Sequence, residues 1–207
     1  LDATGANDQV LTIAGLPVDG RLAGVRLTGG NATATYGGGI GIWQSTIALE
    51  ACAVVANRLN SIGSAGAQYG GGIGSCLAAV TMVDCAVVSN QVVQTAWDQN
   101  VIGGGIGIRE GRWRTLRGVI AGNVANGSLR SWNYGGGLYV EGGTHQFHNL
   151  LLYSNRCTKV GGGQPIAKYD GDGAYVLSTT DVTFRNCTLV DNAAQGLSSR
   201  SNILANS

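Results

Sequence analysis

Tyr36-Gly37-Gly38-Gly39-Ile40 is the stretch that decides the fold, because close copies of it recur every 32 or 33 residues. An asparagine lies 20 residues after the first glycine of each full copy, beginning with Asn57. The other copies are Tyr69-Gly70-Gly71-Gly72-Ile73, Ile102-Gly103-Gly104-Gly105-Ile106, Tyr134-Gly135-Gly136-Gly137-Leu138 and the degenerate Tyr169-Asp170-Gly171-Asp172-Gly173-Ala174, with asparagines Asn90, Asn123, Asn155 and Asn192. A fixed period in this range is typical of stacked-repeat proteins.

Apolar residues before each asparagine alternate in a way that predicts short β-strands. In the first repeat Ile47 and Leu49 share one parity, whereas Cys52 and Val54 share the other. This pattern indicates two strands that meet at a corner, and the segment after the glycines makes a third strand. Three short strands per coil predict an all-β fold, a right-handed parallel β-helix (solenoid) of about six to seven coils.

Composition agrees with one elongated domain. The chain has 35 glycines without a Gly-X-Y period, which excludes collagen, and 44% hydrophobic residues, which suffice for a core. A net charge of +1 argues against a nucleic-acid partner, and no apolar run approaches a membrane span. We expect a single β-helix domain over 1–207, with an N-terminal coil at 1–35, five repeats at 36–192 and a short terminal coil at 193–207.

The repeated residues also predict how the coils turn and stack. Glycine permits a positive φ at a tight corner and a close approach of neighbouring coils. The repeated asparagine tolerates the left-handed region at a second corner, and its amide can hydrogen-bond from coil to coil. Two pairs of opposite charges fall in equivalent positions of successive coils, which supports this register: Asp84 with Arg117, and Arg109 with Glu141.

The repeat resembles that of a known group of proteins. The glycine segments followed by Cys-Ala-Val-Val-Ala-Asn57 or Cys-Ala-Val-Val-Ser-Asn90 are similar to repeats of polymorphic outer-membrane proteins and related bacterial surface β-helix proteins. The opening at residues 1–31 resembles the coil that precedes such repeats, and residues 201–206 resemble a shortened last repeat. The resemblance implies a β-helix fold and a role in surface display or adhesion. The chain departs from the group in showing no membrane barrel, sorting signal or evident cap.

The segment from Arg109 to Arg117 is the most charged part of the chain. Arg112 and Arg114 should point outward on either side of an inward Trp113. Because no carboxylate cluster lies beside them, we expect a solvated face and no calcium site, with an anion-binding groove as the alternative. His145 falls in an inward position without a nucleophile beside it, so we expect no catalytic residues, no metal and no cofactor.

Two of the five cysteines, Cys52 and Cys85, are expected to be reduced. Cys52 and Cys85 occupy the same inward position of adjacent coils, where neighbouring strands lie slightly too far apart for a relaxed disulfide. We expect them to act as small buried hydrophobic residues. Cys76 falls in an outward position, which predicts an exposed thiol.

The segments after each asparagine should stack on one side of the rod, and they provide the candidate binding residues. Tryptophan together with amide and charged side chains suits the recognition of a sugar or a protein. The candidates are Trp97, Asp98, Asn126, Arg130 and Trp132. The alternative is that the two tryptophans only pack the loops onto the coils.

These observations favour an extracellular or cell-surface β-helix with a non-catalytic structural or adhesive function. The alternative is a carbohydrate-binding or carbohydrate-active β-helix protein, with a glycan as partner. Both ends of the chain fall in mid-coil, so we expect either head-to-tail stacking with itself into a filament or the remainder of a longer chain as partner.

Overall fold

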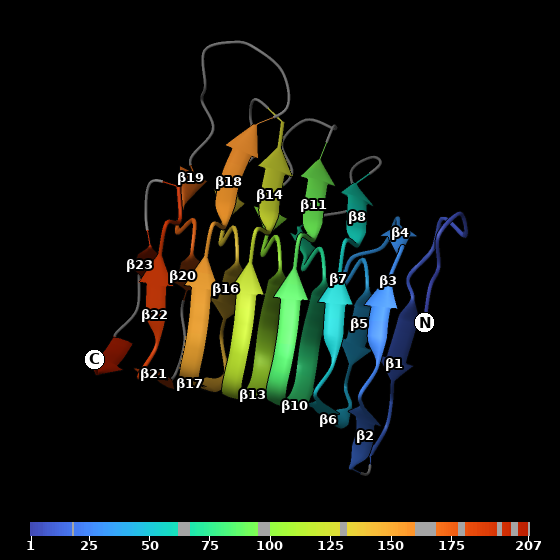
Figure 1. Ribbon diagram of the computed structural model, residues 1–207, viewed down its shortest axis with the longest axis horizontal. Coiled ribbons are helices and arrows are strands. Elements are labelled where there is room, and N and C mark those ends of the chain that lie inside the picture. Colours follow the sequence, from blue (N-terminus) through green and yellow to red (C-terminus); the bar gives the residue numbers. More distant parts are fainter. Residues whose placement is uncertain are drawn as a thin grey trace.

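The computed structural model describes residues 1–17, 19–61, 67–94, 100–128, 132–159, 169–177, 181–193, 196–199 and 203–206. Within these residues the chain forms a right-handed parallel β-helix whose coils stack along the long axis (Figure 1). Each coil returns to pair in parallel with the coil before it; for example, Ile73 pairs with Ile40 on one side and with Ile106 on the other. The predicted fold class is therefore confirmed.

Three faces enclose the core, as the alternation predicts, and in two repeats they join into a single 16-residue strand bent at the corners. These two strands, β10 (Ile73–Val88) and β13 (Ile106–Ala121), contribute to every face. The first face adds β1 (Leu11–Ala14), β5 (Ile40–Trp43), β16 (Leu138–Glu141), β20 (Ala174–Leu177) and β23 (Leu197–Ser199). The second face adds β2 (Gly20–Ala23), β6 (Thr46–Glu50), β17 (Thr144–Tyr153), β21 (Asp181–Arg185) and β24 (Ile203–Asn206). The third face adds β3 (Arg26–Thr28), β7 (Ala53–Val55), the end of β17 and β22 (Thr188–Val190).

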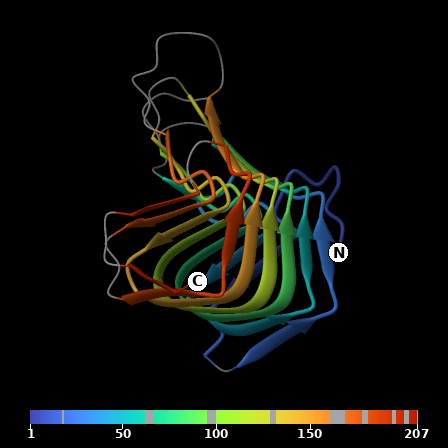
Figure 2. The same cartoon turned by 60° about the vertical axis from the view of Figure 1, so that its left-hand side comes forward.

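Two narrower sheets extend the coils beyond the predicted three strands and form an arm along one side (Figure 2). One consists of β4 (Asn31–Ala32), which follows Gly30, and of four strands that follow the asparagines: β8 (Arg58–Ser61), β11 (Gln91–Gln94), β14 (Val124–Gly127) and β18 (Arg156–Lys159). The other precedes the glycines and consists of β9 (Gln68–Tyr69), β12 (Val101–Ile102), β15 (Asn133–Tyr134) and β19 (Tyr169–Asp170). A small apolar cluster, including Leu59, Val92 and Val101, packs between the two sheets. The expected stacking of the post-asparagine segments on one side is thus confirmed.

Left-handed residues turn the chain at each corner. The first glycine of every repeat has a positive φ, +68° at Gly37, as predicted. A Cβ on the following residue, Gly38, would overlap the carbonyl oxygen of Gly71 in the next coil, so only glycine fits there. The prediction that the asparagines themselves are left-handed is wrong. The residue before each asparagine has the positive φ, for example 54° at Ala56 and 56° at Ser89, because the asparagine backbone must aim its N–H at the next coil.

The asparagines form one hydrogen-bonded ladder along the interior, as predicted. Nδ2 of each asparagine donates to Oδ1 of the next, at 3.0 Å from Asn57 to Asn90 and 3.1 Å from Asn90 to Asn123. The ladder continues to Asn155 at 3.0 Å and to Asn192 at 3.1 Å. The same Oδ1 atoms also accept the backbone N–H of the preceding asparagine, at 3.0 Å for Asn57. One amide therefore satisfies both side-chain and main-chain groups of its neighbour in a buried site.

The core consists of columns of equivalent apolar side chains from successive coils. Trp113 and Phe147 are among the fully buried residues, and Phe147 stacks on Phe184 with centroids 4.8 Å apart. His145 takes an apolar position between Trp113 and Val182 in the register and is fully buried, as expected from the sequence. Its Nε2 lies 2.6 Å from the Gly142 carbonyl oxygen, whereas its Nδ1 has no hydrogen-bond partner among the described residues. Burial therefore lowers the pKa of His145 below its ordinary value.

None of the five cysteines forms a disulfide. The expectation for Cys52 and Cys85 holds, whereas the expectation for Cys76 does not. Cys52 and Cys85 are buried neighbours, with the Cys52 N–H donating to the Cys85 Sγ at 3.4 Å. Burial raises the pKa of the Cys85 thiol to about 11. The expectation of an exposed Cys76 is wrong, because its side chain is 3% exposed. Cys76 does pair with Trp43 in the predicted register, but the Tyr36 side chain reaches over this position and interacts with it.

The two predicted charge pairs have different outcomes. Arg117 forms a bidentate pair with Asp84, with both N–O distances 2.7 Å. Arg109 and Glu141 are neighbours in register, as predicted, but the structure gives no ion pair between them. Instead, the Arg109 guanidinium donates to the Tyr36 hydroxyl at 3.5 Å. Surface pairs of this kind contribute little to stability, so the register rests on the interior.

Replacing Asn90 by alanine tests the ladder. The buried Asn57 N–H and the Val54 carbonyl would lose their partners, and an unsatisfied buried group costs about 1–3 kcal/mol. We expect Asn90→Ala to lower the free energy of unfolding by at least about 2 kcal/mol in urea denaturation. The neighbouring Gln91→Ala, at a partly exposed residue, is the control and should change it little. Equal effects of the two substitutions would contradict a structural role of the ladder.

The buried His145 predicts a loss of stability in mild acid. The unfolded chain binds this proton near pH 6.5, but the folded chain binds it only at lower pH. The unfolded state therefore holds more protons in that window, and the free energy of unfolding falls as the pH drops below about 6.5. Urea denaturation at pH 7.5 and 5.5 should show a smaller decrease for His145→Val than for the wild type. Gln146→Val, at an exposed position of the same strand, should keep the wild-type decrease.

Candidate functional site

An aromatic pocket of about 170 Å³ lies where the first face meets the arm. Sheet strands β9, β12 and β15 provide one wall, and outward residues of β16 and β20 provide the other. The lining residues are Ala67, Tyr69, Asn100, Ile102, Trp132, Tyr134, Tyr139, Glu141, Tyr175 and Leu177. Below, this site is called the aromatic pocket.

The pocket arises from a substitution within the repeat. Gly41, Gly74 and Gly107 occupy an outward position of the first face, and the last two repeats place Tyr139 and Tyr175 there instead. A Cβ on Gly74 would overlap the Tyr69 carbonyl oxygen, because the arm lies directly on the earlier coils. In the last two coils the tyrosine rings fill the space between the first face and the arm.

The aromatic rings of the pocket form a continuous series of ring-to-ring contacts. Tyr134 stacks on Tyr175 with centroids 4.5 Å apart, and Tyr139 stacks on Tyr175 at 5.8 Å. Tyr69 meets Tyr139 edge-on at 6.0 Å. Trp132 meets Tyr134 edge-on at 6.3 Å and is 44% exposed, whereas these tyrosines are at most 5% exposed. The tyrosines form the rigid base of the pocket, and Trp132 presents its indole to solvent.

Glu141 adds a carboxylate to this aromatic surface. Its Oε2 accepts hydrogen bonds from the hydroxyls of Tyr69 at 2.9 Å and Tyr139 at 3.4 Å. Burial first, and the Glu141 charge second, raise the pKa of both tyrosines above the ordinary value, so both hydroxyls stay protonated near neutral pH. Glu141 is thereby held in one orientation with one oxygen already occupied. Such a carboxylate suits hydrogen bonding to a ligand hydroxyl.

The structure brings one of the five predicted binding residues into the pocket. Trp132 lines it, whereas Asn126 lies in β14 on the other sheet of the arm, with its Oδ1 buried. Trp97, Asp98 and Arg130 lie outside the described residues. The sequence reasoning missed the tyrosines and Glu141. The signal that could have found them is the replacement of glycine by tyrosine at positions 139 and 175 of an otherwise regular repeat.

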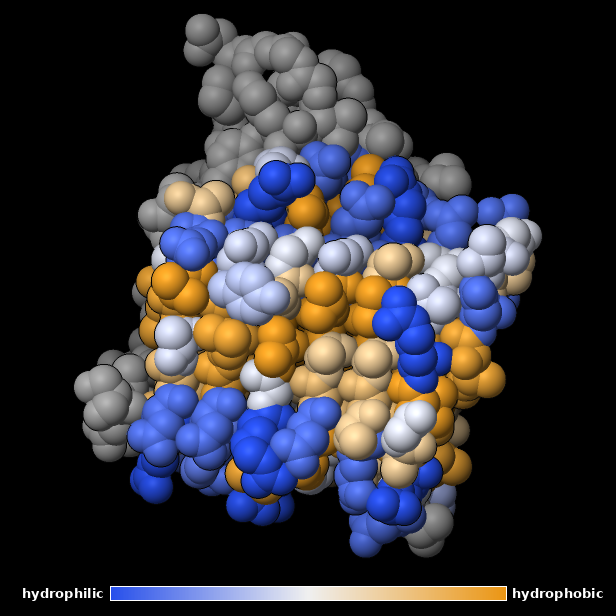
Figure 3. Space-filling view, in the orientation of Figure 1, coloured by the Kyte–Doolittle hydropathy of each residue, from blue (hydrophilic) through white to orange (hydrophobic). Residues whose placement is uncertain are grey.

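A second surface stands out on the third face. Figure 3 shows a hydrophobic band across the middle of the molecule, bordered by hydrophilic residues. In the register it consists of two rows of outward side chains: Ala53, Ala86, Val119, Leu151 and Thr188 in one, and Val55, Val88, Tyr153 and Val190 in the other, where Ala121 lies between Val88 and Tyr153 but is only 2% exposed. Tyr153 is 39% and Val190 43% exposed. We call this surface the apolar band.

Comparisons with known proteins add no family to this description. No family model, no curated protein and no solved structure matches the chain. In the part of the chain that the structure describes, no helix is long and apolar enough to cross a membrane. In the same part, no three His, Cys, Asp or Glu residues come together as a group that could hold a metal ion.

Proposed function

We propose that this chain is a non-catalytic structural or adhesive β-helix of the cell surface or extracellular space. The observation that supports it best is the apolar band, where a flat parallel sheet turns apolar residues to the outside in every coil from β7 to β22. A contiguous apolar surface of this kind marks a site of association. The location rests on the resemblance of the repeats to bacterial surface proteins.

A second copy of the chain is the partner that fits the apolar band. Two sheets with apolar faces pack about 10 Å apart, with side chains interdigitated as in a β-sandwich. The side chains of the band are short or flat, which suits such face-to-face packing. The asparagine ladder from Asn57 to Asn192 and the core columns lie inside the coils, so a partner on the outer face of the sheet does not contact them. This contact is lateral, and head-to-tail stacking stays a separate prediction.

Charged substitutions in the apolar band test this proposal. The double variant Val88→Lys, Leu151→Lys should weaken self-association at least tenfold in sedimentation velocity over a concentration series, because two charges would be buried without partners. The control is Gln146→Lys, Thr183→Lys, which adds the same charge to outward positions of the second face. A wild-type chain that stays monomeric at every concentration, or a control that dissociates equally, would refute the lateral contact.

Recognition of a glycan at the aromatic pocket is the second candidate function, and the exposed Trp132 favours it. An indole face packs on the C–H face of a sugar ring, while Glu141 and Asn100 can bond its hydroxyls. The pocket volume corresponds to a single sugar ring. Cleavage of a glycosidic bond uses a pair of carboxyl groups, but Glu141 is the only acidic residue among the described lining residues. Binding without cleavage is therefore the chemistry that fits.

Trp132→Ala tests glycan recognition. A glycan array with the wild type would identify the ligand, and calorimetry should then show binding at least about tenfold weaker for the variant, as for a central aromatic contact. Trp43→Ala is a matched control, because Trp43 is 41% exposed but does not line the pocket. The idea fails if the array shows no ligand or if Trp132→Ala binds as tightly as the wild type.

A further inference from the structure

A groove crosses the outer side of the second face at the start of the rod. It combines two adjoining hollows of about 440 and 450 Å³ that share Thr46, Ala79 and Arg112. Small side chains of β6 and β10 form the floor, namely Thr46, Ala48, Ala79 and Thr81. Leu16, Pro17 and Asp19, which precede β2, form one wall, and the arginines of β13 form the other.

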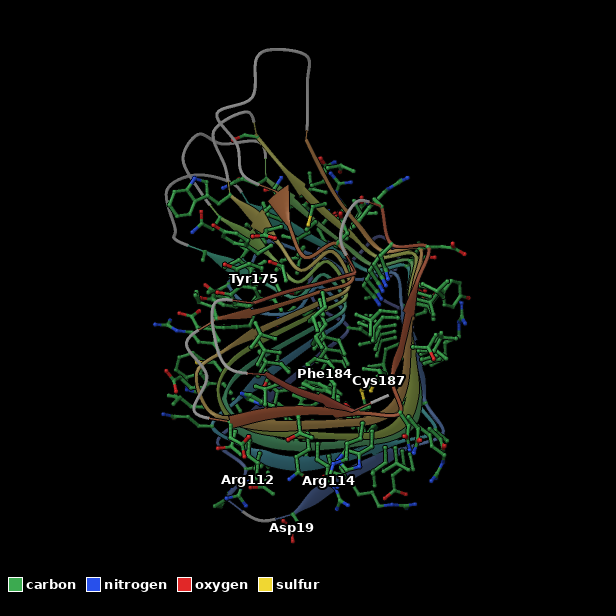
Figure 4. All side chains as sticks on the ribbon, turned by 90° about the vertical axis from the view of Figure 1, so that its left-hand side faces the viewer. Asp19, Arg112, Arg114, Tyr175, Phe184 and Cys187 are labelled. Atoms are coloured by element: carbon green, nitrogen blue, oxygen red, sulfur yellow. The ribbon has the colours of Figure 1, made fainter. Side chains whose placement is uncertain are left out.

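Arg112 and Arg114 point away from the core into this groove (Figure 4). The intervening Trp113 is 1% exposed and anchors the strand, so both guanidinium groups leave a rigid backbone on the same side. Residues two apart on a strand lie about 7 Å apart. The pair therefore offers two planar donors at a fixed spacing along one wall.

These two arginines differ from the paired arginines on the same molecule. Arg21 pairs with Glu50 at 2.6 Å, and Arg117 pairs with Asp84 at 2.7 Å. Among the described residues, no ion pair involves Arg112 or Arg114. Their neighbours in register are neutral: Ala79 and Thr144 beside Arg112, and Thr81 and Gln146 beside Arg114. The sequence placed both arginines outward, and the structure adds the hollow in front of them.

We propose that this arginine groove binds a glycan that carries carboxylate or sulfate groups. Each guanidinium can bind one oxyanion through two parallel hydrogen bonds. The hydroxyls of Thr46, Thr81 and Thr144 and the small floor suit sugar hydroxyls and ring edges. This site lies on a different face from the aromatic pocket and does not depend on it.

The backbone of the groove favours a glycan over an acidic peptide. An extended peptide binds a sheet by adding a strand at a free edge. Here β6, β10 and β13 pair with a strand on both sides, so their main-chain groups are already used. Only side chains face the ligand, which is the arrangement that a polyhydroxylated anionic chain can use.

Binding of two defined polyanions tests the proposal. Polygalacturonate oligosaccharides present carboxylates, and heparin oligosaccharides present sulfates as well. We expect the wild type to bind at least one of them in calorimetry, with affinity that falls as salt rises. The double variant Arg112→Gln, Arg114→Gln should lose about tenfold or more in affinity, because two charge-assisted contacts disappear. Asp19→Asn should bind more tightly, because it removes a repelling carboxylate from the opposite wall.

The control variant has the same net charge as the groove variant. Arg117→Gln, Arg156→Gln also removes two positive charges, but from Arg117, which is paired with Asp84, and from the exposed Arg156 in the arm. It should bind like the wild type, as should Trp132→Ala. Circular dichroism would confirm that every variant is folded. The proposal is overturned if neither polyanion binds, if the control loses as much affinity as the groove variant, or if polyglutamate of equal charge binds as tightly.

Discussion

The asparagine ladder is the interaction on which the rest of the structure depends. A parallel β-helix must satisfy main-chain groups at every corner, where the regular strand pairing is interrupted. In this chain the asparagine side chains do so in every coil of the ladder. The Asn90 Oδ1 accepts the backbone N–H and the side-chain Nδ2–H of Asn57. The Asn90 Nδ2 in turn donates to the Val54 carbonyl oxygen and to the Asn123 Oδ1. Each coil is thereby fixed in register with the next at one interior point. The glycine segments pack directly against this ladder and stack closely, with the Gly39 N–H donating to the Gly72 carbonyl at 2.9 Å.

Because the interior sets the register, outward positions are free to differ from coil to coil. The same outward position of the first face holds Gly74 in one repeat and Tyr139 in another without any change of strand pairing. Likewise, one outward position of the second face holds Thr46, Ala79 and Arg112 in successive coils. The three surfaces on which the proposals rest therefore arise from different outward side chains on the same pattern of strand pairing. Each is built from residues about 33 apart in sequence and adjacent in space.

A shared fold does not assign a function, so the proposals rest on the chemistry of the surfaces. The aromatic pocket contains one oriented carboxylate, Glu141, with an exposed indole beside it. The arginine groove contains cations with neutral neighbours. The apolar band contains no charged side chain, and most of its residues are aliphatic. These features are the support for the proposed binding and association.

The sequence by itself determined the coil, its period, its inward columns and its ladder, because each depends on residues at a fixed spacing. The Asp84–Arg117 pair and the burial of Cys52, Cys85 and His145 follow from the same spacing. Only the tertiary structure decided what covers an outward position. Cys76 is outward in register yet buried, and the Tyr36 side chain interacts with it there. The stacking of the post-asparagine segments on one side was predicted, but the two sheets of the arm were not, since strands of two to four residues are too short to show an alternation. The pocket and the groove likewise required the structure, because each forms between segments whose approach depends on how the whole coil bends rather than on any local pattern.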